Sequence, residues 1–123
     1  MSKRRITAEL LAQEGACPDQ LDRFQERFPD GIDPETVQPE EVVGLDVLWA
    51  VLHMLPAPAR EVFKEAAWKA FREARATEWE AYKEGGASAL ARKAYKEATD
   101  AAWEAYDEAK ARIAIELFRE YWQ

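Results

Sequence analysis

The feature that most constrains the fold is an eleven-residue repeat of aromatic and alanine residues between positions 68 and 117. A full unit places an aromatic residue first, a second aromatic or large apolar residue three positions later, and an alanine after three more. Full units begin at Trp68 and Trp103, the unit that begins at Trp79 has Gly85 in place of the alanine, and a shorter one begins at Tyr95. Eleven residues span three helical turns at about 3.67 residues per turn, close to the natural helical period. The repeat therefore predicts long, nearly straight helices with an aromatic stripe.

A glycine pair, Gly85-Gly86, interrupts the repeat. Glycine ends helices readily because it tolerates a left-handed backbone. We therefore predict two long helices, at about residues 59–84 and 88–121, joined by a hinge at the glycine pair. A connection this short makes the helices antiparallel neighbours. The predicted architecture is a long helical hairpin over residues 59–122.

Folding at this hinge predicts how the aromatic stripe packs. Phe71 is expected near Trp103, and Trp68 near Tyr106, with wide rings opposite small alanines. Most of the stripe would then hold the hairpin together. Little of it would be left for binding.

The first half of the chain predicts a head of three or more short helices, over residues 7–55. Thr7 and Pro18 are helix-start signals, and Gly15 and Pro29 are stop signals. Two short turns are expected in residues 32–44. Residues 47–55 are apolar nearly all round, so we expect that helix to be buried centrally. The fold class is therefore all-α, and residues 1–123 form a single helical domain of head and hairpin.

Composition limits where such a chain can act. Of its 123 residues, 48% are hydrophobic and 33% are charged. The longest stretch without Asp, Glu, Lys or Arg, residues 47–59, contains Pro56 and Pro58 and is too short to cross a bilayer. The basic start lacks the apolar region of a signal peptide, and one cysteine permits no internal disulfide. We expect a cytoplasmic protein that does not engage a membrane.

Charge is distributed unevenly along the chain. The net charge is −7; residues 1–59 hold five bases and eleven acids, and the rest hold twelve bases and thirteen acids. No Lys or Arg lies between Arg27 and Arg60. Nucleic-acid binding requires a basic face, so direct binding to DNA or RNA is not expected, and a basic protein partner fits better. The candidate partner-binding acids in this stretch are Asp30, Asp33, Glu35, Glu40 and Glu41.

The C-terminal aromatics form a second candidate binding group. Phe118, Tyr121 and Trp122 project on more than one side of the predicted helix. One part of this group is therefore expected to stay exposed, and Trp and Tyr are favoured anchors at protein interfaces.

Two segments carry a family resemblance. They are Ala16-Cys17-x-x-Gln20-x-x-x-Phe24-x-x-x-Phe28-Pro29-x-Gly31 and Gly44-Leu45-Asp46-x-x-Trp49. The pattern resembles a module in small uncharacterised proteins of bacteria and their phages, in which Ala-rich Trp-x-Ala-Tyr repeats sometimes follow. It covers residues 16–55, and the remainder is similar only in style. The resemblance implies a phage or mobile-element accessory protein and implies no catalytic residue.

Residues with reactive side chains are few. His53, the only histidine, lies in the apolar segment and is expected to be a buried or half-buried structural residue. Cys17 precedes a proline at a predicted helix start and is expected to be a small buried cap. A Cys17–His53 nucleophilic pair is conceivable, but no orienting acid can be named. No ligand spacing predicts a metal, and no motif predicts a cofactor.

These observations favour a non-enzymatic protein-binding module that inhibits or modulates a larger protein. A narrower version is a phage-encoded antagonist that imitates nucleic-acid charge, although the long helices are nearly neutral. One alternative is a structural homo-oligomer assembled through aromatic helix faces. Another is a thiol-dependent enzyme that uses Cys17 and His53.

Overall fold

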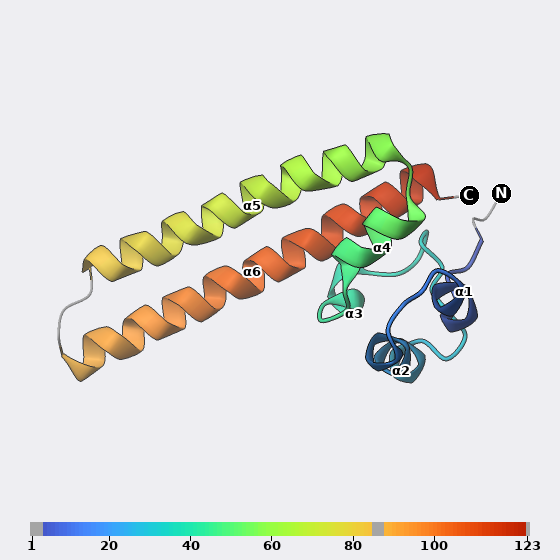
Figure 1. Ribbon diagram of the computed structural model, residues 1–123. Coiled ribbons are helices and arrows are strands. Elements are labelled where there is room, and N and C mark those ends of the chain that lie inside the picture. The colour runs from blue at the N-terminus through green and yellow to red at the C-terminus, as the bar shows by residue number, and fades with distance from the viewer. Residues whose placement is uncertain (1–3, 85–87, 123) are drawn as a thin grey trace.

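A computed structural model describes residues 4–84 and 88–122, and the all-α helical hairpin is confirmed (Figure 1). Long α5 and α6 lie side by side and antiparallel, while the short helices gather where α5 begins and α6 ends (Figure 1). The predicted hinge, Gly85-Gly86, lies outside the described residues. The elements in order are α1 (Ala8–Gln13), α2 (Pro18–Arg27), α3 (Pro39–Val42), α4 (Val47–Met54), α5 (Ala57–Glu84) and α6 (Ala89–Tyr121).

Side-chain caps explain where several helices begin. The Thr7 hydroxyl accepts the Leu10 N–H at 3.2 Å, as expected for the N-cap of α1. The Asp46 carboxylate accepts the Trp49 N–H at 3.0 Å at the start of α4. Helix α5 starts at Ala57, two residues earlier than predicted, because a proline is tolerated in the first helical turn.

The N-terminal segment is tied to the loop after α2. Ile6 and Ile32 form an isolated antiparallel bridge, with each N–H donating to the other carbonyl at 2.8 Å. Gly31 permits this approach: its φ is +83°, and a Cβ there would lie 2.8 Å from the Ile6 carbonyl oxygen. Of the two turns predicted in residues 32–44, one is α3. The other is a single turn closed by the Val37 N–H on the Asp33 carbonyl at 3.0 Å.

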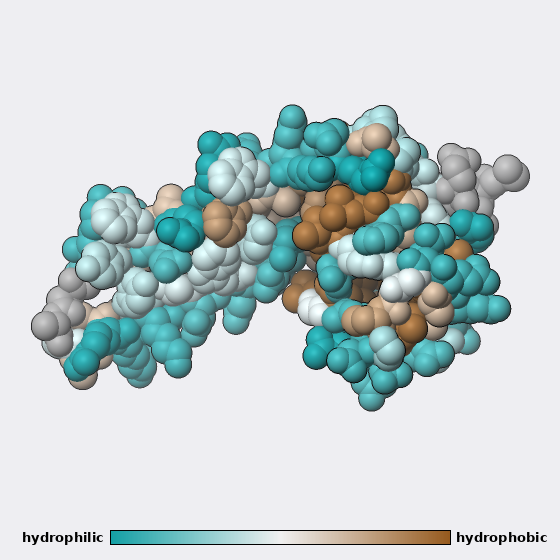
Figure 2. Space-filling model, in the orientation of Figure 1, coloured by the Kyte–Doolittle hydropathy of each residue, from teal (hydrophilic) through white to brown (hydrophobic). Residues whose placement is uncertain are grey.

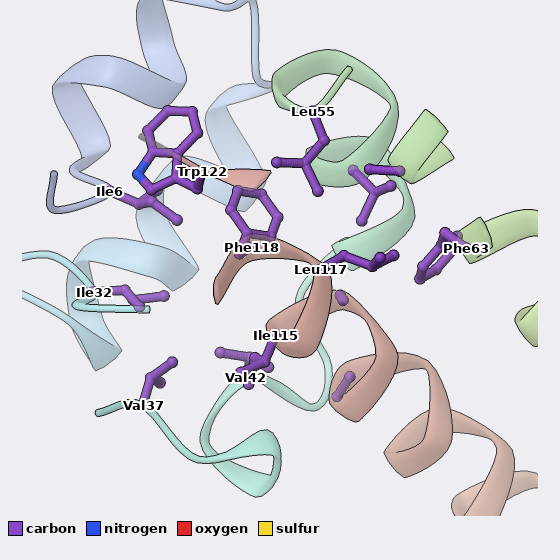
Figure 3. Packing of buried hydrophobic residues seen from close by; sticks show 14 of the residues in the cluster. Ile6, Ile32, Val37, Val42, Leu55, Phe63, Ile115, Leu117, Phe118 and Trp122 are labelled. Atoms are coloured by element: carbon purple, nitrogen blue, oxygen red, sulfur yellow. The ribbon is translucent and has the colours of Figure 1, made fainter. Parts of the chain in front are cut away.

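The hydrophobic core lies between the head and the adjoining end of the hairpin (Figure 3). The last turns of α6 cross its middle, and no polar or charged residue among those described is buried. The buried cluster comprises Ile6, Leu11, Phe24, Ile32, Val37, Val42, Val51, Leu55, Ala59, Phe63, Ala111, Ala114, Ile115, Leu117, Phe118 and Trp122.

Beyond this core, the hairpin projects as a two-helix arm (Figure 1). Among the described residues of 66–84 and 88–110, only Ala74 is buried. Two helices alone cannot cover each other's side chains on every side, and no third element lies over the arm. The expectation that the hairpin would use most of its aromatic stripe internally is therefore wrong for Trp68, Trp79 and Tyr82, which are exposed.

Helix α4 also differs from expectation. Val51 is fully buried, but Leu48 is 45% exposed, so α4 is not buried on all sides. The helix packs against α6 and the start of α5. These neighbours cover one side of it.

Candidate functional site

An aromatic ridge runs along one side of the arm. We use this name for the side chains Trp68, Phe71, Trp79 and Tyr82 of α5 and Tyr95, Trp103 and Tyr106 of α6. At about 100° per residue, the buried Ala74 and half-buried Ala81 face α6, and Phe71 lies at the edge of that face. Trp68 and Trp79 lie further round, about 140–160° from its centre. Alanines thus form the seam, and aromatics form the ridge beside it.

The rings of the ridge contact one another in two clusters. In the first, ring centroids are 5.5 Å apart for Trp68–Phe71, 5.6 Å for Phe71–Trp103 and 5.9 Å for Phe71–Tyr106. The predicted proximity of Phe71 to Trp103 is confirmed. Ring pairs at these separations and tilts are mutually attractive. In the second cluster the distances are 5.7 Å for Trp79–Tyr82 and 6.3 Å for Tyr82–Tyr95.

Glu78 connects the two helices beneath these rings. One carboxylate oxygen accepts the Trp103 indole N–H at 3.2 Å, and the other accepts the Tyr95 hydroxyl at 3.4 Å. Hydrogen bonds to an ionised acceptor are stronger than neutral ones. Glu78 therefore fixes the orientation of two α6 rings, a role that the eleven-residue pattern did not reveal.

The outer rings of the ridge are exposed to solvent. Trp68 is 58% exposed, Trp79 is 57% exposed and Tyr82 is 63% exposed. In Figure 2, pale side chains of intermediate hydropathy run along the arm between teal charged ones. Where the ridge meets α4, a shallow hollow of about 340 Å³ is lined by Leu48, Phe63, Lys64, Ala67, Trp68, Phe71 and Tyr106. Large exposed aromatics in a continuous strip are a feature of interaction surfaces.

The segment of residues 30–43, which carries the five candidate acids, has basic neighbours that lie outside it in the sequence. Arg5, Arg27 and Arg119 come from three parts of the chain and donate hydrogen bonds to backbone carbonyls of this region. Their guanidinium groups place positive charge beside a stretch that itself contains no Lys or Arg. The acceptors are Asp30 (3.0 Å) and Gly31 (3.2 Å) for Arg5, Val43 (2.6 Å) and Glu41 (3.4 Å) for Arg27, and Pro34 (2.8 Å) and Val37 (2.9 Å) for Arg119.

Two of the candidate acids also stabilise the loop itself. Asp33 accepts the Glu35 N–H at 3.0 Å, and Glu41 accepts the Gln38 N–H at 3.3 Å in a capping box. Asp30 and Glu40 are exposed. The five acids predicted to bind a partner therefore do not form a single uncompensated patch.

Of the three C-terminal aromatics predicted to bind a partner, two are buried. Phe118 and Trp122 are each only 7% exposed and belong to the core. The Trp122 indole N–H donates to the Arg4 carbonyl at 2.7 Å, and the Arg4 guanidinium lies 4.7 Å from the ring centroid. Tyr121 is half-buried against the same core. The head surrounds the last turn of α6, so aromatic side chains on several sides of this turn pack against the core.

Cys17 and His53 both differ from expectation. Cys17 is the N-cap of α2, but it is exposed and its side chain makes no capping hydrogen bond. His53 is exposed and stacks on Trp49 with ring centroids 4.6 Å apart, while Nδ1 lies 2.9 Å from the Trp49 carbonyl oxygen. No hydrogen bond joins the two side chains. In the described ranges, no group of three or more His, Cys, Asp and Glu residues could hold a metal ion.

A second feature is an apolar pocket of about 230 Å³ between the head and the last turns of α6, which we call the head pocket. It is lined by Ile6, Leu11, Gly15, Ala16, Cys17, Gln20, Leu21, Phe24, Ile32, Pro34, Val37, Val42, Leu45, Asp46, Val47, Trp49, Ala50, Ala114, Ile115 and Phe118.

Comparison of the chain with protein-family models, with curated proteins and with solved structures found no match. None of the helices in the described residues is both long and apolar enough to span a bilayer.

Proposed function

We propose that this protein is a protein-binding module that docks on a larger partner through the aromatic ridge. The observation that carries the proposal is the exposure of Trp68 and Trp79, each above one half, on rings already held in place by their neighbours. Tryptophan and tyrosine are enriched among the residues that dominate binding energy at protein interfaces.

The ridge is organised before any partner arrives. Trp68 stacks on Phe71, Trp79 stacks on Tyr82, and Glu78 fixes rings of α6 from below. Side chains that are already ordered lose less conformational entropy on binding. The two tryptophans stand eleven positions apart on one helix, roughly 16 Å at 1.5 Å per residue. A partner groove with two apolar pockets at that spacing fits the ridge.

Charge favours a partner whose groove has a basic rim. The arm is nearly neutral, whereas the head beside it carries most of the net charge of −7. A basic rim next to the groove would lie over the head and steer association. The acids of residues 30–41 are proposed to act through this long-range field rather than as direct anchors.

A second candidate function is self-association through the same ridge. Residues 60–123 hold twelve bases and thirteen acids, so two arms can approach without strong repulsion. The exposed parts of the seven rings amount to on the order of 600 Å², near the roughly 800 Å² that each partner buries in a standard interface. An antiparallel pairing would bring the first cluster of one copy against the second cluster of the other.

A matched pair of double variants tests both candidates. Trp68→Ala/Trp79→Ala removes the outer rings of the ridge, while Val62→Ala/Leu90→Ala removes exposed apolar side chains that lie off it. A partner isolated with the wild-type chain should bind the control variant unchanged in calorimetry. Its affinity for the ridge variant should fall at least 100-fold, because each anchor contributes about 2 kcal/mol or more.

Equal affinity for the ridge variant and the wild type would refute docking through the ridge. Sedimentation equilibrium of the wild type decides the second candidate. A concentration-dependent dimer that the ridge variant loses and the control keeps supports self-association. A monomer at millimolar concentration rejects it.

Three further properties of the protein are proposed from its sequence alone. A non-enzymatic role, a cytoplasmic location and an accessory role in a phage or mobile element follow from the composition and from the resemblance of residues 16–55.

A further inference from the structure

We infer that the head pocket binds an uncharged, compact apolar molecule of about nine heavy atoms. An apolar cavity of about 150 Å³ accommodates benzene, so a cavity of about 230 Å³ has room for a molecule half as large again. The site lies between the head and the last turns of α6 and shares no residue with the aromatic ridge. It would therefore act independently of the proposed docking surface.

The lining specifies an apolar occupant. Its polar side chains are those of Cys17, Gln20 and Asp46, and two of them already have partners. Gln20 Oε1 accepts the Asp46 N–H at 3.3 Å, and the Asp46 carboxylate accepts the Trp49 N–H at 3.0 Å. Water in a buried site needs two to four polar partners, and this lining offers few. The remaining walls of the pocket are formed by apolar side chains of the core, and the apolar atoms of a ligand fit against them.

Charge excludes an anionic occupant. The head carries more than twice as many acids as bases, and the Asp46 carboxylate stands at the wall of the pocket. An anion would meet this field, and an ionised group buried without a partner is strongly disfavoured. A neutral aromatic or branched hydrocarbon meets neither difficulty.

The pocket also has an entrance for such a molecule. Three of its lining residues, Gly15, Cys17 and Asp46, are themselves exposed. They lie on the α1–α2 connection and at the start of α4. The pocket is therefore open to solvent at a rim formed by these two segments.

Titration of the ¹⁵N-labelled wild-type protein with n-propylbenzene, which has nine heavy atoms, tests this inference. Saturable amide shifts are expected at pocket residues such as Ala50 and Ala114, together with a rise in the unfolding temperature. The anionic analogue 3-phenylpropionate should bind at least tenfold more weakly. The Trp68→Ala/Trp79→Ala variant should bind n-propylbenzene as the wild type does, which separates this site from the ridge.

Two variants block the pocket in different ways. Ala50→Leu adds volume inside it, and Ala76→Leu makes the same change at an exposed position of α5 as the control. Cys17→Phe covers the entrance without losing a cap hydrogen bond, because the Cys17 side chain makes none. Both blocking variants should weaken binding at least tenfold, and the control should not.

Three results would overturn the inference. The first is no saturable shift in the wild type up to the solubility limit of n-propylbenzene. The second is unchanged affinity in a folded Ala50→Leu or Cys17→Phe variant. The third is saturable shifts confined to α5 around the ridge.

Discussion

Separate replacement of Trp122 and Trp79 by alanine distinguishes the core aromatics from the ridge aromatics. Trp122 is 7% exposed, donates an indole hydrogen bond at 2.7 Å and packs at a tilt against Phe118 with ring centroids 5.8 Å apart. Trp79 is 57% exposed and contacts mainly Tyr82. The two residues are chemically identical, so a difference between the variants reports the surroundings alone.

The expected loss is at least about twofold larger for Trp122→Ala than for Trp79→Ala. Truncating a buried tryptophan costs about 3–5 kcal/mol, and the lost hydrogen bond at Trp122 places its variant at the upper end of that range. Less than half of Trp79 is removed from water, on the order of 100 Å², which is about 2.5 kcal/mol at about 25 cal/mol per Å². Alanine returns roughly 0.5 kcal/mol through its higher helix propensity. We therefore expect a loss of about 2 kcal/mol or less for Trp79→Ala.

Urea unfolding followed by far-ultraviolet circular dichroism measures both losses without relying on the tryptophans themselves. The midpoint should fall at least twice as far for Trp122→Ala as for Trp79→Ala, with unchanged slopes. A loss for Trp79→Ala that equals or exceeds the loss for Trp122→Ala would refute this assignment of core and ridge.

Three further predictions concern residues that position these parts. Glu78→Ala should destabilise the arm by about 1–3 kcal/mol and speed hydrogen exchange of the indole N–H that it accepts, whereas unchanged exchange would contradict its bridging role. Gly31→Ala should cost at least about 2 kcal/mol in urea unfolding, because its Cβ would meet the Ile6 carbonyl at 2.8 Å; Gly15→Ala, with a similar φ and open space, should cost only about 1 kcal/mol. Arg119→Lys should cost about 1–2 kcal/mol equally in low and high salt, since its acceptors are neutral carbonyls; a strong salt dependence would argue against them.

The sequence predicted the helices because local chemistry determines them. Caps at Thr7 and Asp46 and the eleven-residue spacing depend on neighbours within a few turns. The sequence did not predict which aromatics are buried. Trp68 lies on α5 and Trp122 is the C-cap of α6, and the position of the head along the hairpin determines that only Trp122 is buried. That position depends on contacts between distant segments, such as the Arg119 bonds to the loop after α2.

The candidate site was missed for a related reason. Periodicity placed Trp68, Phe71, Trp79 and Tyr82 on one stripe but did not show that alanines would occupy the seam. The head pocket had no sequence signal, because its small side chains Ala16, Ala50 and Ala114 come together only in the folded chain. The alanines of the repeat allow the two helices to approach closely, and the narrow seam between them leaves the wide rings outside.

Site-specific photo-crosslinking in cells that naturally produce the protein tests the central claim most directly. A benzophenone amino acid at Arg75, which helical spacing places between Trp68 and Trp79 on the ridge, should crosslink to one protein or to a second copy of the chain. The same group at Arg112, exposed on the side of α6 turned away from the ridge, is the control. We predict a discrete adduct from position 75 that is absent from position 112 and is lost on addition of Trp68→Ala/Trp79→Ala. Equal adducts from both positions, or an adduct that survives removal of the two rings, would contradict docking through the ridge.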